Sequence, residues 1–74
     1  MTLVEFRYLV ALAAEGSFSR AAERCSVSQP TLSVAIAKIE DEFGVALFDR
    51  GKGQVRPTDA GRKVVEQATI ALRE

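Results

Sequence analysis

The feature that most restricts the fold of this chain is a very short break between two helical segments. Residues 20–25 have high helix propensity, and residues 29–43 carry apolar side chains at helical spacing. Only Ser26, Val27 and Ser28 separate the two segments, so the chain must turn sharply and the helices must lie against each other. Helix, tight turn and helix together predict a helix-turn-helix motif.

Residues 29–43 are predicted to form the recognition helix of this motif. Ser28 is its predicted N-cap, Pro30 fits the first turn, and Gly44 ends the helix. The spacing of the apolar residues predicts a buried stripe formed by Leu32, Ile36, Ile39 and Phe43. The opposite face carries small uncharged side chains and one cation: Gln29, Pro30, Ser33, Val34, Ala37 and Lys38. A face of this kind enters a DNA major groove without steric conflict.

Two helices are predicted before the break. Thr2 and Glu5 have the spacing of a capping box and Gly16 is a natural stop, which together predict a first helix. The residues of that helix expected to face inward are Leu3, Phe6, Leu9, Val10 and Ala13. A short second helix is expected to be capped by Ser17 or Ser19.

A basic hairpin is predicted after the third helix. Residues 46–49 and 54–57 are short extended runs on either side of a loop with two glycines. The chain has ten Lys and Arg against ten Asp and Glu, but residues 50–56 carry three positive charges and no acid. Because the potential at a surface depends on local clustering, this segment is a basic edge on a neutral chain. Such a loop alone is a solvated surface, whereas beside a groove-sized helix it is predicted to bind phosphates.

A fourth helix is predicted to begin after Thr58, with Asp59 near its positive end. Its apolar stripe is predicted to pair with a second copy of the chain and consists of Val64, Val65, Ala68, Ala71 and Leu72. A domain of this size buries only about 60% of its unfolded surface and is marginally stable alone. The chain is therefore expected to lean on a partner, either a second copy of itself or the rest of a longer chain, and the stripe predicts a dimer.

The composition argues against several classes of function. There is no His and only one Cys, which removes a Ser-His-Asp triad, a disulfide framework and a Cys-based zinc site. We therefore predict no enzymatic activity, no catalytic residues, no metal and no cofactor, and we interpret Cys25 as a small core residue rather than a redox sensor. No apolar run reaches the roughly 18 residues of a membrane span. Glu5 and Arg7 interrupt the apolar core that a signal peptide needs, so a cytoplasmic location without membrane attachment is expected.

A dense set of residues is shared with a known family. It consists of Phe18, Ala21, Ala22, Val27, Ser28, Gln29, Pro30, Ser33, Ile36, Ile39, Glu40, Gly44, Leu47, Phe48, Arg50, Thr58 and Gly61. The set resembles the N-terminal DNA-binding domain of the LysR-type transcriptional regulators, and the resemblance runs from Leu3 to Leu72. Residues 8–13, 25–33 and 38–42 further resemble the OxyR-like subgroup of that family.

The resemblance implies a mainly α-helical fold: a winged helix-turn-helix, with a three-helix core and a two-stranded β wing, followed by a linker helix. It places the winged helix-turn-helix in residues 1–58, with the helix-turn-helix at about 18–37 and the wing at about 46–57. Residues 59–74 would begin the linker, or dimerisation, helix, and an effector domain is expected beyond them. In this bacterial family the linker helices pair antiparallel, and the dimers assemble into tetramers on an interrupted inverted repeat in double-stranded DNA.

The predicted function is sequence-specific binding of double-stranded DNA, with the third helix in the major groove and the wing on the phosphate backbone. The residues predicted to contact DNA are Ser28, Gln29, Pro30, Thr31, Ser33, Val34, Lys38, Arg50, Lys52 and Arg56. Gln29 is expected to pair with an adenine edge and Val34 to meet a thymine methyl group. Since Val34 and Ala35 are apolar, thymine contact or shape readout is favoured over guanine recognition. The alternative is a winged-helix module that binds another protein, which the zero net charge also suits.

Overall fold

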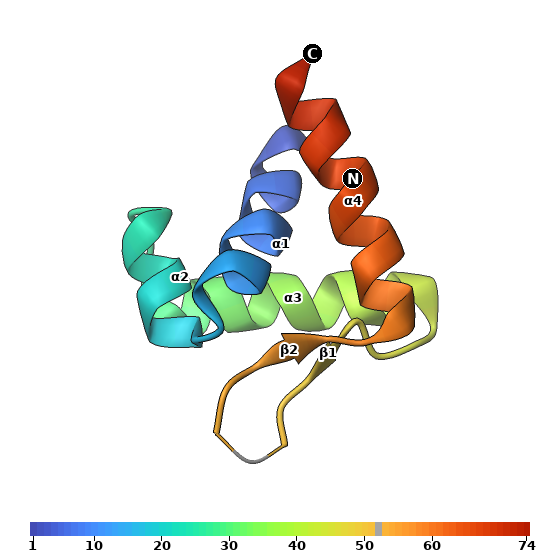
Figure 1. Ribbon diagram of the computed structural model, residues 1–74. Helices are drawn as coiled ribbons and strands as arrows, with labels where there is room; N and C mark the ends of the chain where they lie inside the picture. The colour runs from blue at the N-terminus through green and yellow to red at the C-terminus, as the bar shows by residue number, and fades with distance from the viewer. Residues whose placement is uncertain (52) are drawn as a thin grey trace.

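The computed structural model describes residues 1–51 and 53–74, and it is mainly helical with one small sheet (Figure 1). The elements in chain order are α1 (Leu3–Glu15), α2 (Phe18–Arg24), α3 (Gln29–Phe43), β1 (Phe48–Asp49), β2 (Arg56–Pro57) and α4 (Asp59–Arg73). Figure 1 shows α1 and α4 standing on the same side of α3, while the loop of the hairpin projects from the opposite end of the molecule. The predicted winged helix-turn-helix followed by a further helix is confirmed.

The helix boundaries follow the predicted caps. The hydroxyl of Thr2 accepts from the N–H of Glu5 at 3.2 Å, and the Glu5 carboxylate accepts from the N–H of Thr2 at 3.0 Å, which completes a capping box. Of the two candidate caps for α2, Ser17 is the one that accepts from a backbone N–H. Gly16 and Gly44 end α1 and α3 in the left-handed conformation, with φ of 67° and 73°.

The turn between α2 and α3 is held by backbone hydrogen bonds. The N–H of Ser26 donates to the carbonyl of Glu23, and the N–H of Val27 donates to the carbonyl of Ala22. Val27, the one apolar residue of the break, packs against the core. Ser26 has a φ of 59°, which makes it the one non-glycine residue with positive φ in the part of the chain that the structure describes.

Replacing Ser26 by glycine is expected to stabilise the chain. The left-handed conformation costs an L-residue roughly 1–2 kcal/mol, and glycine adopts it freely at a smaller entropic cost, so a net gain of about 0.5–1 kcal/mol is expected. Urea denaturation followed by circular dichroism measures the change. The matched control is Ser33→Gly inside α3, which is expected to lose about 0.5 kcal/mol. A loss of stability in Ser26→Gly would contradict the prediction.

The core lies where α1, α2 and α3 meet and is closed by the start of the wing. The largest fully buried side chains are Leu9, Leu12, Leu32, Ile36, Ile39 and Leu47. Two expected members lie outside it, since the exposed fraction of Leu3 is 57% and that of Phe43 is 45%. Both expectations were wrong for the same reason: each residue lies in a terminal turn of its helix, where neighbouring elements cover it on fewer sides.

The wing is shorter as a sheet than predicted. Residues 46–49 and 54–57 were expected to be strands, but β1 and β2 have two residues each and pair antiparallel, with Phe48 opposite Pro57 and Asp49 opposite Arg56. A backbone group next to β2 forms its hydrogen bond outside the sheet. The N–H of Val55 donates to the carbonyl of Gly16 at 3.0 Å, which ties the base of the wing to the end of α1.

Candidate nucleic-acid interface

The first turn of α3 is exposed and its polar side chains are ordered by one another. The Ser28 hydroxyl accepts from the N–H of Thr31 at 3.2 Å and donates to the Thr31 hydroxyl at 2.8 Å. The side-chain oxygen of Gln29 accepts from the hydroxyl of Ser19 at 2.9 Å, so the start of α2 orients the amide. Both amide N–H groups of Gln29 and the second lone pair of its oxygen remain for other partners. The predicted base-reading residue is therefore held in place before any ligand arrives.

The outer face of α3 is free, as the predicted groove-entering face requires. Val34 has an exposed fraction of 69%, and Pro30 and Ala37 are also exposed. Ser33 is half-buried, so it offers less surface than was expected. Lys38 is exposed, but its ammonium group lies 3.9 Å from the carboxylate of Glu5 on α1, which partly neutralises its charge.

The two described cations of the wing, Arg50 and Arg56, have different surroundings. One guanidinium nitrogen of Arg50 lies 3.0 Å from the carboxylate of Glu40, and the guanidinium carbon lies 5.0 Å from the centre of the Phe18 ring. The other N–H groups of Arg50 remain available for phosphate, because a guanidinium carries five donors. Arg56 is exposed on β2. Lys52 lies outside the described residues, so its predicted role stays a prediction.

Sequence reasoning missed three residues of this surface. Ser19 orients Gln29, and Glu40, to which the sequence analysis assigned no contact, accepts three hydrogen bonds. Arg20 is exposed in α2, at the helix that crosses the DNA backbone in helix-turn-helix proteins. Arg20 could have been identified from the sequence by its position in the first turn after the predicted cap of that helix.

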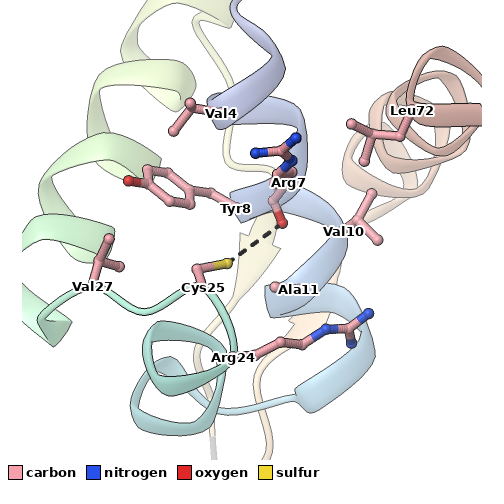
Figure 2. A pocket seen from close by; sticks show the side chains of 9 residues that line it. All are labelled: Val4, Arg7, Tyr8, Val10, Ala11, Arg24, Cys25, Val27 and Leu72. Atoms are coloured by element: carbon pink, nitrogen blue, oxygen red, sulfur yellow. Dashed lines mark hydrogen bonds between the residues drawn. The ribbon is translucent and has the colours of Figure 1, made fainter.

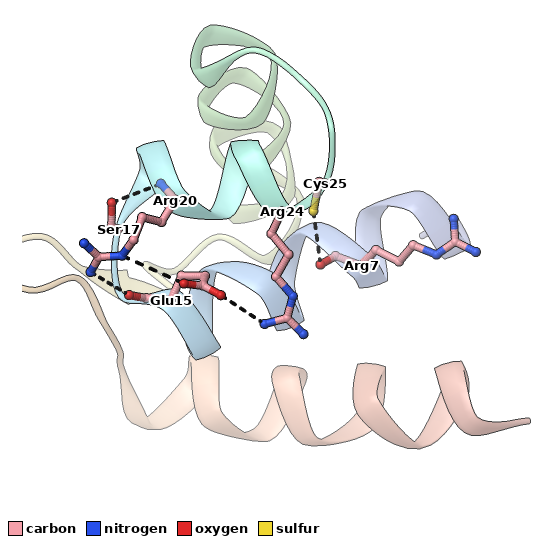
Figure 3. A network of polar contacts seen from close by, with 6 residues as sticks. All are labelled: Arg7, Glu15, Ser17, Arg20, Arg24 and Cys25. Carbon is pink, nitrogen blue, oxygen red and sulfur yellow. Dashed lines mark hydrogen bonds and ion pairs between the residues drawn. The ribbon is translucent and has the colours of Figure 1, made fainter.

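A second cluster of charges lies beside α2 (Figure 3). The Arg20 guanidinium donates to the carbonyl of Glu15 at 3.2 Å, and Arg24 pairs with the Glu15 carboxylate at 3.4 Å. These contacts fix both arginines to the end of α1. The Glu15 carboxylate therefore reduces the net positive charge along α2.

Cys25 lies at a cavity rather than in the closed core. Its thiol donates weakly to the carbonyl of Arg7 at 3.9 Å, and the side chain is half-buried against the core cluster (Figure 2). The cavity has a volume of about 450 Å³ and lies between α1, α2 and the end of α4, where Leu72 lines it. Cys25 is therefore only partly a core residue: it packs against the core cluster and also lines the cavity.

The predicted pairing stripe of α4 is partly used within the chain. Ala68 is completely buried in the single chain, so its place in a partner-facing surface is corrected: packing of α4 on α1 already covers it. Val64 and Val65 are half-buried and pack against the core, while Ala71 and Leu72 are half-buried near the end of the helix. These four residues keep surface that another chain could cover.

The described residues offer neither a metal cluster nor a membrane span. Within residues 1–51 and 53–74, no three His, Cys, Asp or Glu side chains are grouped as metal ligands. None of the helices in that part of the chain is long and apolar enough to cross a membrane.

Comparison with known proteins assigns the fold to a family. The sequence model of the "Bacterial regulatory helix-turn-helix protein, lysR family" matches residues 3–62. The "Hydrogen peroxide-inducible genes activator" of Pectobacterium carotovorum is 53% identical over 74 residues, which is the whole of this chain and 24% of that protein. The chain thus spans about a quarter of the length of this relative.

Solved structures agree with this assignment. A full-length OxyR from Pseudomonas aeruginosa superposes with a TM-score of 0.91 and 57% identity, covering 99% of this chain and 25% of that one. The BenM DNA-binding domain in complex with benA site 1 DNA superposes with a TM-score of 0.93 and 37% identity, covering 99% of this chain and 82% of that one. The predicted family resemblance is confirmed, and the OxyR-like subgroup is supported. The chain belongs to the LysR family of bacterial regulatory helix-turn-helix proteins.

Proposed function

We propose that this chain binds double-stranded DNA in a sequence-specific manner as the DNA-binding domain of a bacterial transcriptional regulator. The observation that carries the proposal is the exposed outer face of α3. This face presents the apolar side chain of Val34, and at its N-terminal end the Ser19 hydroxyl orients the amide of Gln29. The BenM DNA-binding domain, which has the same fold, was crystallised in complex with DNA. The absence of His and of a paired nucleophile and base favours a binding role over an enzymatic one.

In this proposal α3 selects the sequence and the wing supplies affinity. The start of α3 enters the major groove, where Gln29 meets an adenine edge and Val34 a thymine methyl group. Phosphate contacts made by helix ends and wing cations carry most of the affinity and make it depend on salt. The proposed DNA-contacting residues are Ser28, Gln29, Pro30, Thr31, Ser33, Val34, Lys38, Arg50, Lys52 and Arg56.

The proposed organisation follows the family. Residues 1–58 form the winged helix-turn-helix, and residues 59–74 begin a linker helix that continues toward an effector domain. The surface left on α4, Val64, Val65, Ala71 and Leu72, pairs with a second copy, and dimers assemble into tetramers on an interrupted inverted repeat in the longer protein. A dimer sets the distance between half-sites at about one helical turn or a multiple of it. The protein would act in the cytoplasm.

Selection of bound duplexes from a random DNA pool tests the proposal. Specific binding enriches one half-site sequence, and dimer binding enriches two copies of it with fixed spacing and symmetry. A salt titration on the selected duplex then separates DNA binding from the alternative, a module that binds another protein, because counterion release gives a steep linear dependence of log affinity on log salt. Failure to enrich any sequence would overturn specific binding.

Replacing Gln29 by alanine is expected to relax base preference at one position of each half-site. Loss of a two-fold contact to a base edge removes about 1–3 kcal/mol of discrimination, while binding to random DNA changes little because the phosphate contacts remain. Competition binding against single-base variants of the selected duplex measures the effect. Gln67→Ala, at an exposed glutamine of α4, is the matched control. Equal losses on selected and random DNA would show that Gln29 does not read a base.

A further inference from the structure

A single carboxylate joins the far end of α3 to the wing. One oxygen of Glu40 accepts from the backbone N–H groups of Leu47 at 2.8 Å and Phe48 at 3.2 Å, and the other accepts from the Arg50 guanidinium at 3.0 Å. The guanidinium of Arg50 in turn lies over the ring of Phe18, the first residue of α2. We call Glu40, Leu47, Phe48, Arg50 and Phe18 the Glu40 cluster.

The acceptor and the backbone donors of the Glu40 cluster are largely shielded from solvent, whereas the Arg50 side chain is exposed. The Glu40 side chain has an exposed fraction of 16%, and Leu47 and Phe48 are buried. Hydrogen bonds to an ionised acceptor are shorter and stronger than neutral ones, and a buried N–H that loses its acceptor is costly. Glu40 therefore defines where β1 begins relative to α3.

Glu40 is too far from the start of α3 to read a base. It is the twelfth of the fifteen residues of α3, which places it roughly 16 Å along the helix axis from Gln29. Its contacts lead instead to the wing, through β1 and Arg50, and to α2, through Phe18. Glu40 can therefore affect DNA binding only by changing the positions of the wing and α2 relative to α3.

Resting on the proposed function, we infer that Glu40 is the positioning residue of the wing. It sets the angle and distance between α3 and the hairpin, so that the wing cations reach the phosphates flanking the base pairs that α3 reads. Arg50 has a double role in this arrangement: one nitrogen is held by Glu40, which leaves the guanidinium oriented for a phosphate. Without the carboxylate, α3 still docks but the wing no longer lies at phosphate distance.

The experiment compares Glu40→Gln with Glu42→Gln in the 74-residue chain. Both substitutions remove one negative charge from the same helix end, but the side chain of Glu42 is exposed and forms no hydrogen bond or ion pair with the residues that the structure describes. An amide at position 40 has one acceptor oxygen where the carboxylate has two, so its N–H₂ group must face either the two backbone N–H groups or the Arg50 guanidinium, and one side of the Glu40 cluster loses its acceptor. Circular dichroism and thermal melting first establish the temperature at which both variants are folded.

Two readouts separate positioning from mere stability. In Glu40→Gln, the log-log salt slope on the selected duplex is expected to fall by about 1 and affinity by about tenfold, equally on selected and random duplexes. Hydroxyl-radical footprinting is expected to lose protection at the nucleotides that flank the half-site while keeping it at the half-site. Glu42→Gln is expected to keep both the slope and the flanking protection.

The possible results are distinguishable. An unchanged slope and footprint in folded Glu40→Gln, even with a lower melting temperature, would overturn the positioning role. If Glu40→Gln does not fold, Glu40→Asp is the deciding variant with the same two readouts, since it keeps the charge but is one methylene too short to reach both backbone N–H groups and Arg50. No salt slope in the wild-type chain would overturn the proposed function together with this inference.

Discussion

Replacing Gly61 by alanine is expected to cost the chain about 3 kcal/mol or more of its free energy of unfolding. A Cβ at this position would overlap the carbonyl oxygen of Leu47 and lie 2.8 Å from its carbonyl carbon. Moving that oxygen would break hydrogen bonds, since it accepts from the N–H of Thr58 at 3.0 Å, and the Thr58 hydroxyl donates to the carbonyl of the neighbouring Ala46 at 2.8 Å. The methyl group must therefore push the start of α4 away from the wing.

The loss would be large for a chain of this size, for which a total of roughly 4–11 kcal/mol is typical. Urea denaturation followed by circular dichroism measures it. Gly44→Ala is the matched control: it adds the same methyl group at a φ of 73° where no atom lies within 4 Å, so only the backbone strain of about 1 kcal/mol is expected. If Gly61→Ala were no more costly than Gly44→Ala, α4 would not approach Leu47 as closely as the structure shows.

Replacing Ile36 by alanine is expected to destabilise the chain by about 2–5 kcal/mol. Ile36 is fully buried at the middle of α3, on the face that packs against α1 and α2. Truncation removes apolar area from the core and leaves a cavity that surrounding helices fill only partly. The same denaturation measurement reports the loss, and DNA binding is expected to weaken only at temperatures where the variant begins to unfold.

Val34→Ala is the control on the opposite face of the same helix. Val34 is largely exposed, so truncation is expected to change stability by less than about 0.5 kcal/mol. Affinity for the selected duplex should nevertheless fall several-fold, because the proposed contact with a thymine methyl group is lost. A large loss of stability in Val34→Ala would contradict the assignment of the two faces of α3.

The helix boundaries could be predicted because their signals are local. The capping box at Thr2 and Glu5, the glycine stops at Gly16 and Gly44, and the cap at Ser28 each involve residues within one helical turn. The free face of α3 followed from the period of its apolar residues. Local signals failed at helix ends and strand ends, where the presence of a covering neighbour decides burial, as at Phe43 and in the shortened wing strands.

The sequence predicted which residues belong to the candidate site but not the contacts that orient them. Gln29 and Arg50 were recognisable from residue type and position, whereas the contacts that orient them involve residues ten positions away. Glu40 stands among three consecutive acids and looks like its exposed neighbours Asp41 and Glu42 in the sequence. Nothing in the spacing of these acids distinguishes the one that turns toward the wing.

By itself, the sequence determined that the chain forms a helix-turn-helix with a basic hairpin and which face of its third helix stays free, since caps, stops and periodicity act within a few residues. Only the tertiary structure decided that Glu40 holds the wing, that Ala68 is covered by α1 and that Gly61 lies against Leu47. These features depend on which distant segments meet and at what separation, and that outcome is set by packing of the whole core rather than by any local pattern.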